Sequence, residues 1–152
     1  MRRISVQAED FDPGAEIALL QACASGVGAL ASFVGVVRSD AVHPIVAMTL
    51  EHYPAMTAAA IHRIGEKAEQ RFALAGCSIV HRVGRLLPGE RIVFVGTASS
   101  HRRAALEATA FLIDWLKTSA PFWKKEEFAD GSARWVEARK ADDEAAARWA
   151  KT

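Results

Sequence analysis

The chain has 152 residues, of which 51% are hydrophobic, so it is long enough to form one domain with a buried core. A formal net charge of +1 argues against a general polyanion-binding protein, and any anion recognition must come from local clusters of cations. No segment approaches the roughly 20 apolar residues of a membrane span, and polar residues follow the first strand too early for a signal peptide, so we expect a single cytoplasmic domain over residues 1–152.

The first half of the chain alternates between strand and helix patterns. Hydrophobic periodicity predicts strands at 3–7, 29–38 and 45–52, and helices at 12–24 and 54–72. Asp12 and Pro13 are a typical N-cap and first helical residue, and Gly35 indicates a bulge within its strand. The buried face of the second helix is expected to include Met56, Ala60, Ile64 and Ala68.

The second half predicts two hairpins around a long helix. The first hairpin joins strands 77–86 and 91–98 through a Pro-Gly turn, and the second joins 122–128 to 134–138 around Asp130 and Gly131. The helix between them runs over 99–117 with Ser99 or Ser100 as its cap, and a short helix is expected at 141–151. The fold class is therefore α+β, with a mixed or antiparallel sheet, two main helices on one side and an extra hairpin.

Lys117 and Lys124 flank a Pro-Phe-Trp segment at the end of that long helix. Because Lys124 directly follows two large apolar side chains, its ammonium should be held at the rim of a pocket. Apolar surroundings and neighbouring cations lower the pKa of a lysine, which suits it to acid–base or nucleophilic chemistry. The alternative is a lysine whose ammonium reaches water from an ordinary solvated hairpin.

The start of the same helix carries His101, Arg102 and Arg103, where the helix dipole favours carboxylates. Backbone N–H groups together with these cations are typical of a phosphate-binding site. The alternative is that the three side chains extend into water at a small cost in stability.

The remaining polar residues indicate structural roles. Cys23 and Cys77 have neither metal-ligand spacing nor a CxxC pattern, so we expect free thiols. His52, His62 and His81 lack the spacing of a zinc site, and no metal site is predicted.

Ordered motifs along the whole chain resemble one family, the large, catalytic subunit of molybdopterin synthase. These motifs are SFVGVVR at 32–38, LEHYPAM at 50–56, VHRVG at 80–84, SSHR at 99–102, LKTSAPFWKKE at 116–126 and RWVEAR at 134–139. The resemblance spans about residues 3 to 150, and it implies an α/β hammerhead-type fold. It also implies a homodimer in which each protomer binds a small ubiquitin-like sulfur-carrier subunit, giving a heterotetramer.

The implied reaction is sulfur transfer from the thiocarboxylated C-terminus of the carrier to cyclic pyranopterin monophosphate, which forms the dithiolene of molybdopterin. No resident cofactor is implied, because molybdenum enters later in a different protein. By the same resemblance Lys117 and Lys124 are the catalytic lysines, and Phe33 lines the path of the carrier tail. The residues that would bind substrate are Val36, Val37, Arg38, His101, Arg102, Lys125, Glu126 and Arg139.

The resemblance adds two details to this set. Arg139 matches an arginine that approaches the pocket of the neighbouring protomer, and Val36 stands where some relatives have lysine. The alternative to an enzyme is a non-catalytic module that binds a phosphorylated small ligand or a ubiquitin-like tail. Such a module needs Arg38, His101 and Arg102 but not both lysines, so the lysine pair favours the enzyme.

Overall fold

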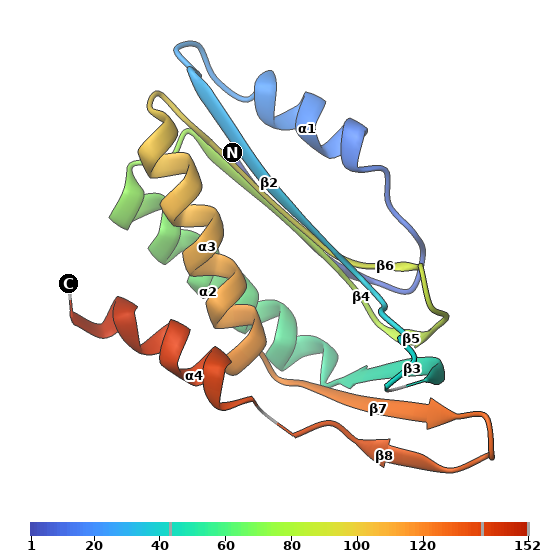
Figure 1. Cartoon of the computed structure of the whole chain (residues 1–152). Coiled ribbons are helices and arrows are strands. Elements are labelled where there is room, and N and C mark those ends of the chain that lie inside the picture. The colour runs from blue at the N-terminus through green and yellow to red at the C-terminus, as the bar shows by residue number, and fades with distance from the viewer. Residues whose placement is uncertain (43, 138, 152) are drawn as a thin grey trace.

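The protein contains two four-stranded sheets, and the one with the longer strands is a mixed sheet that runs through the centre of the molecule (Figure 1). The computed structural model describes residues 1–42, 44–137 and 139–151. The sheet has the order β1 (Arg2–Gln7), β4 (Gly76–Arg82), β6 (Arg91–Ser99) and β2 (Ala29–Val36). β1 and β4 are parallel and the other neighbours are antiparallel, which confirms the predicted mixed arrangement.

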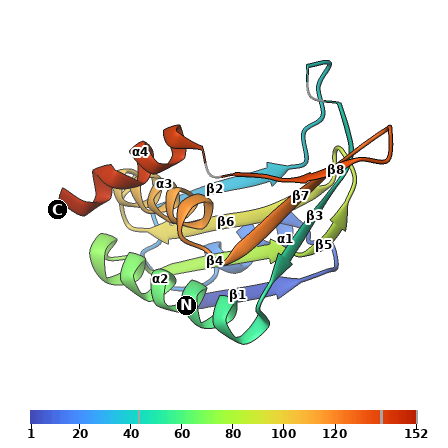
Figure 2. The same ribbon diagram turned by 90° about the horizontal axis from the view of Figure 1, so that it is seen from below.

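A second, antiparallel sheet lies at one end of the first (Figures 1 and 2). Its order is β5 (Gly84–Leu86), β3 (Ile45–His52), β7 (Phe122–Phe128) and β8 (Ala133–Trp135). The pairing of β7 with β8 confirms the predicted hairpin, although its second strand ends at Trp135. Ala138, the expected end of that strand, lies outside the described residues. This sheet has a small core of its own, made by Val37, Ile45, Leu50 and Leu86.

Helices cover both faces of the first sheet (Figures 1 and 2). α1 (Pro13–Gln21) packs on one face, and α2 (Pro54–Phe72) and α3 (Arg102–Thr118) pack side by side on the other. α4 (Lys140–Ala147) continues into a 3-10 turn, η1 (Arg148–Lys151), and lies along α3. None of the helices described is both long and apolar enough to cross a membrane.

The two faces of the first sheet have separate hydrophobic clusters. Beneath α1 lie Phe11, Leu20, Val80, Phe94 and Ala98. The larger cluster, between the sheet and α2 with α3, contains Ile61, Ile64, Ala68, Cys77, Ile79, Val95, Phe111 and Leu112. Cys77 and Cys23 are free thiols, as predicted. α3 is thereby held rigidly along its length, which fixes the positions of both of its ends.

Several local predictions are confirmed. Asp12 caps α1 by accepting a hydrogen bond from the backbone N–H of Gly14 at 2.8 Å. The strand register shifts between Gly35 and Val36, where the bulge was expected. α2 has the predicted bounds, but α1 ends at Gln21 rather than Ala24 and β2 ends at Val36 rather than Arg38.

The prediction of one strand over residues 77–86 is wrong, because the chain bends at Gly84. Gly84 has a φ of +89°, a left-handed conformation that glycine adopts without strain. β4 therefore ends at Arg82 in the first sheet, and β5 starts at Gly84 in the second. This bend brings the two sheets together at one end of the molecule.

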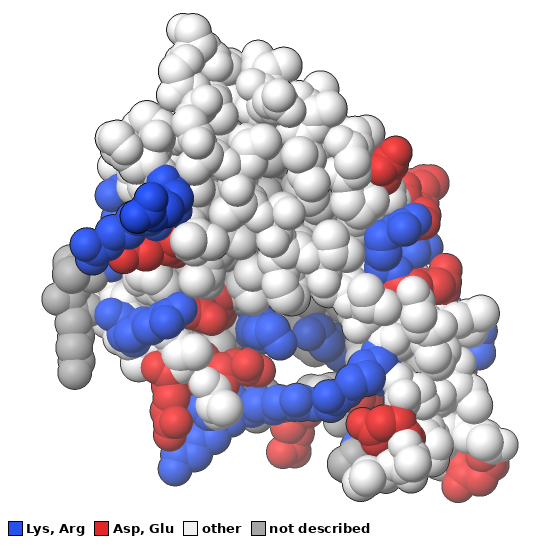
Figure 3. All heavy atoms as spheres, turned by 45° about the horizontal axis from the view of Figure 1, so that its top comes forward, with Lys and Arg blue, Asp and Glu red and all other residues white. Residues whose placement is uncertain are grey.

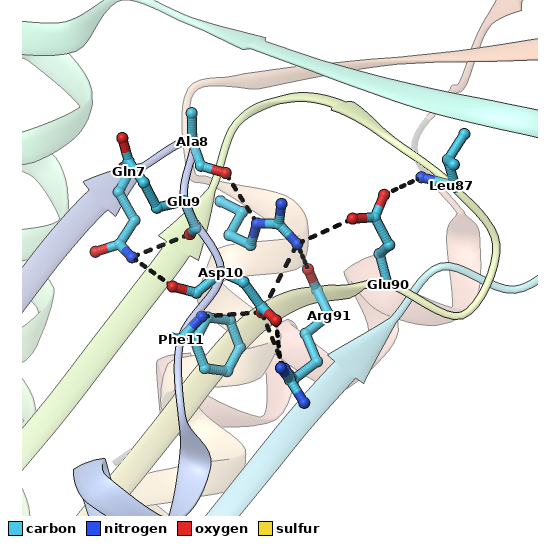
Figure 4. A network of polar contacts seen from close by, with 9 residues as sticks. Gln7, Ala8, Glu9, Asp10, Phe11, Leu87, Glu90 and Arg91 are labelled. Carbon is cyan, nitrogen blue, oxygen red and sulfur yellow. Dashed lines mark hydrogen bonds and ion pairs between the residues drawn. The ribbon is translucent and has the colours of Figure 1, made fainter.

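A polar network around the buried Arg82 stabilises that bend (Figure 4). Its guanidinium donates to the carbonyl oxygen of Ala8 at 3.0 Å and to that of Arg91 at 3.1 Å. The carboxylates of Asp10 and Glu90 lie 3.7 and 3.6 Å away, and Asp10 also pairs with Arg91. Because a buried arginine needs such partners, this network has a structural role.

Two side-chain predictions are also wrong. Ser99 is the buried end of β6 rather than a helix cap, and α3 begins at Arg102 with His101 as an N-cap whose side chain makes no capping bond. Met56 is 51% exposed, because α2 turns a different face to the sheet. That buried face contains Thr57, Ala60, Ile61, Ile64, Gly65 and Ala68.

The two tryptophans of the second sheet, Trp123 and Trp135, contact different residues. The ring of Trp123 lies edge-on to Tyr53 at 4.9 Å, and Trp135 lies under the ammonium of Lys125 at 5.5 Å. The C-terminal helix begins one residue before the predicted start and changes to a 3-10 turn at Arg148.

Candidate active site

A pocket of about 250 Å³ lies where the first sheet, the end of α3 and the start of β7 meet. β2 contributes Phe33 and Val36, α3 contributes Lys117, and β7 contributes Lys124. Four of the residues predicted from the sequence thus line one cavity. The pocket combines an apolar wall with two ammonium groups, a composition suited to an apolar chain segment that ends in an anion.

Lys124 occupies the most enclosed cationic position. It pairs with Leu50 across the antiparallel ladder of β3 and β7, so its backbone is fixed. Burial away from water lowers its pKa, the charge of Lys117 lowers it further, and Asp142 opposes part of the shift. A lysine with a lowered pKa gives up and takes back a proton more readily near neutral pH, which is the property expected of an acid–base group.

Lys117 lies in the last turn of α3, where the helix dipole favours a cation. Its side chain is 46% exposed, and its Nζ lies 4.0 Å from a carboxylate oxygen of Asp142 in α4. The two lysines therefore come from different elements and differ in exposure. Lys117 is the more exposed of the two, whereas Lys124 is set deeper in the pocket.

His81 forms an inner wall of the pocket, although the sequence indicated only a structural role for it. Its ring stacks on Phe122 with centroids 3.9 Å apart, and its Nδ1 lies 2.8 Å from the carbonyl oxygen of Arg82. Burial lowers its pKa to about 4. His81 is therefore neutral at pH 7 and adds no charge beside Lys124.

The depressed pKa of His81 predicts a pH-dependent stability. The unfolded histidine takes up a proton near its usual value of 6.5 while the folded one does not, so stability present above pH 6.5 is lost as the pH falls toward about 4. We expect a loss of about 3 kcal/mol across this window. The free energy of unfolding, measured with urea, should fall between pH 6.5 and 4 more steeply in the wild type than in His81→Phe, which cannot titrate. The exposed His62→Gln is the control, and parallel curves for wild type and His81→Phe would contradict the assignment.

The predicted anion-binding residues His101 and Arg102 lie at the opposite end of α3. The 16 residues from His101 to Lys117 correspond to roughly 24 Å along the helix axis. Both side chains are exposed, and neither forms an ion pair within the described part of the chain, whereas Arg103 pairs with Glu107 at 2.9 Å. A single chain therefore does not bring His101 and Arg102 to the lysine pocket.

Two other predicted substrate-binding residues, Arg38 and Val37, follow the pocket residue Val36 but do not line the pocket. Arg38 follows Val36 by two residues and is largely exposed, with its Nε 3.7 Å from Asp40. Val37 is buried and donates its N–H to Glu90, so its side chain belongs to the core.

Beyond Lys124, successive side chains of β7 point to opposite faces of the second sheet and have different partners. Lys125 faces Trp135, and Glu126 pairs with Arg134 at 3.2 Å. Arg139 lies at the N-cap of α4 and lowers the pKa of Lys124 in its own chain. Its predicted approach to the neighbouring protomer stays a prediction; within one chain its charge acts on Lys124.

The space-filling view shows where charge gathers (Figure 3). Lys and Arg side chains surround a hollow in the lower part of this face, and a broad area above it has no charged side chains. A larger hollow of about 450 Å³ between α2, α3 and α4 contains none of the predicted site residues.

Within residues 1–42, 44–137 and 139–151, no group of three or more His, Cys, Asp or Glu side chains is arranged to hold a metal ion.

The sequence pattern misses Asp142, which lies beside both lysines. Two acidic residues in the first turn of a helix are explained by the helix dipole alone, so nothing in the pattern separates Asp142 from Asp143. Only the packing of α4 against α3 identifies Asp142.

Comparison with known proteins gives consistent matches. The family model described as "MoaE protein" matches residues 6–119. A Pseudomonas aeruginosa protein named molybdopterin synthase catalytic subunit is 52% identical over 147 residues, covering 96% of this chain and 97% of its own. A protein of the same name from Rhizobium meliloti is 48% identical, covering 97% and 96%. The solved structure of a molybdopterin biosynthesis MoaE protein from Burkholderia ambifaria is 50% identical, with a TM-score of 0.84 and full coverage of both chains.

Proposed function

The chain belongs to the MoaE family of molybdopterin synthase catalytic subunits, and from this membership we propose that its lysine pocket transfers sulfur to cyclic pyranopterin monophosphate. The sulfur comes from the thiocarboxylated C-terminus of a small ubiquitin-like carrier, and the product is the dithiolene of molybdopterin. The observation that supports this site most strongly is the convergence of Lys117 and Lys124 on one pocket with an apolar wall. The cytoplasmic location stays a prediction.

The two lysines divide the work of acyl transfer. Once the carrier sulfur has bonded to the substrate, attack of water on the carrier carbonyl carbon breaks the C–S bond, leaving the sulfur on the substrate and a carboxylate on the carrier. This attack places negative charge on the carbonyl oxygen, and the exposed ammonium of Lys117 is suited to stabilise that charge. Lys124 has a lowered pKa and is therefore suited to move protons to and from the substrate. The neutral ring of His81 and the ring of Phe33 form an uncharged wall beside the lysines.

In a homodimer, the anion-binding residues of one protomer can lie next to the lysines of the other. We propose that His101 and Arg102 of one protomer reach the pocket of the other and bind the phosphate of the substrate. Their lack of ion pairs within the described residues supports this role, as does the free N-terminus of α3, whose backbone N–H groups favour an anion. Arg38, which is largely exposed two residues after the pocket residue Val36, is proposed to bind the same anionic substrate.

The carrier tail is proposed to enter past Phe33 toward Lys117. A diglycine end has no side chains, so it fits a narrow channel, and its terminal anion meets the lysines. Deleting this tail should abolish turnover while part of the docking affinity remains, because the folded body of the carrier still has its own contact surface. Calorimetry and turnover measured on the same preparations separate the two effects. Full turnover with a tailless carrier would exclude this route.

Reconstitution tests the proposed function. The purified chain, a thiocarboxylated carrier and cyclic pyranopterin monophosphate should yield a product containing two added sulfur atoms, detected by mass spectrometry. A carrier with an ordinary carboxylate end is the matched control and should yield none. Binding of the pyranopterin without any product from a competent carrier would instead indicate the non-catalytic binding module.

A further inference from the structure

The C-terminal segment, α4 with η1, is fastened to the body of the protein at its far end. The indole N–H of Trp149 donates to the Asp114 carboxylate at 2.8 Å, and Arg148 donates to the same oxygen at 2.9 Å. Arg71 donates to the carbonyl oxygen of Trp149 at 2.9 Å. The Trp149 ring also lies edge-on to Phe111, with centroids 5.5 Å apart, so this end is both hydrogen-bonded and packed.

This fastening places Asp142 opposite Lys117. Asp142 precedes Trp149 by seven residues, two helical turns, and therefore lies on nearly the same side of the segment. Asp114 precedes Lys117 by three residues on α3, so each acidic residue faces a partner on the other helix. Asp142 Oδ1 lies 4.0 Å from Lys117 Nζ, and its side chain is only 29% exposed.

Asp142 is the acidic residue whose charge acts on this group of cations. Lys117 from α3, Lys124 from β7 and Arg139 from the start of α4 bring positive charge to the pocket. The titratable side chains that face Lys124 from the neighbouring strand elements are His81 of β4 and, behind it, His52 of β3. His81 is neutral at pH 7, so it adds no further positive charge. Lys125 and Glu126 have partners elsewhere on the second sheet.

We propose that Asp142 is a positioning residue for the two lysines, held in place by the α4–η1 segment through its Trp149 contact with Asp114. Its carboxylate keeps the Lys117 ammonium directed along the pocket instead of into solvent, and it reduces the repulsion between Lys117 and Lys124. This inference rests on the proposed function for its catalytic consequence. The electrostatic part concerns the free chain alone.

The consequence for Lys124 has a definite sign. Asp142 raises the pKa of Lys124, opposing burial and the neighbouring cations. Removal of its charge should therefore lower that pKa further and leave a smaller fraction of Lys124 protonated at pH 7. If catalysis requires protonated Lys124, the variant should therefore be active only at lower pH than the wild type.

The test compares Asp142→Asn with Asp143→Asn. Both variants remove one negative charge from the same helical turn, but Asp143 is exposed and its side chain has no contact with the lysines among the described interactions. NMR titration of isotope-labelled lysine side chains, assigned with Lys124→Arg, needs neither carrier nor substrate. We expect the pKa of Lys124 to fall in Asp142→Asn and to stay at the wild-type value in Asp143→Asn.

Turnover provides the second measurement. In Asp142→Asn we expect the basic limb of the pH profile of kcat to move to lower pH and kcat to fall by up to about 100-fold, the loss associated with a misplaced catalytic group. Asp142→Glu, which keeps the charge, should recover most of the profile. Equal titrations and profiles for the two asparagine variants would overturn the proposal. An inactive wild type with a shifted Lys124 titration in Asp142→Asn alone would instead overturn the proposed function.

Discussion

Lys117→Ala is expected to remove nearly all turnover, by about 1,000-fold or more, while the protein stays folded. The substitution deletes the charge proposed to stabilise the developing oxyanion, a contribution of roughly 10²- to 10³-fold in other enzymes, and it also disturbs proton transfer by Lys124. Because the Lys117 side chain is about half exposed, the change in the free energy of unfolding should be within about 0.5 kcal/mol. Single-turnover kinetics and thermal unfolding measure the two quantities separately.

Lys117→Arg distinguishes a charge from a proton donor. Guanidinium keeps the positive charge but does not exchange its proton near pH 7, and its planar shape differs from that of an ammonium. We expect this variant to stay well below wild-type turnover. Lys67→Ala, on the exposed side of α2, is the matched control and should be unaffected. Because Lys117 is proposed to act through its charge, wild-type turnover in Lys117→Arg would show that the shape of the cation does not matter at this position.

Mixing two impaired variants is expected to restore activity. Arg102→Ala alone should weaken substrate binding by roughly 1.5–3 kcal/mol, about 10- to 150-fold, through loss of a charge-assisted hydrogen bond. In a heterodimer of Arg102→Ala with Lys117→Ala, a shared site leaves one pocket with both residues intact and one with neither. At limiting substrate, verified heterodimers should therefore recover about half of the wild-type rate.

A second mixture provides the control for this experiment. Arg139 lies close to Lys124 in its own chain. If Arg139 serves that pocket, a heterodimer of Arg139→Ala with Lys117→Ala has one defect in each pocket and should stay weak. Recovery in this mixture would instead support the action of Arg139 across the dimer. Absence of recovery with Arg102→Ala would contradict the shared site.

The sequence predicted those parts of the fold and site that depend on neighbouring residues. The bounds of α2, the bulge at Gly35 and the lowered pKa of Lys124 follow from local periodicity, from a glycine in a strand and from apolar neighbours. The change of sheet at Gly84 could not be predicted in this way, because a stretch with a strand pattern looks the same whether it stays in one sheet or enters another.

The features of the site that depend on contacts between residues distant in the sequence were missed or only partly predicted. Asp142 meets Lys117 because Trp149 fastens the C-terminal segment to α3, and no local pattern contains that contact. The distance between His101 and Lys117 follows from the length of a predicted helix, yet the sequence of one chain does not say what completes each end. Side-chain geometry was needed to separate the two groups of predicted residues.

The most direct test of the lysine pocket as the reaction site is a crystal structure of the assembled protein with its carrier and the pyranopterin. We predict that the carrier tail passes Phe33 and ends within hydrogen-bonding distance of Lys117 or Lys124, in the pocket of about 250 Å³. The substrate phosphate should contact Arg102 of the second protomer. A tail that ends instead in the hollow of about 450 Å³ beside Trp115 and Trp149, with the lysine pocket empty, would contradict the account.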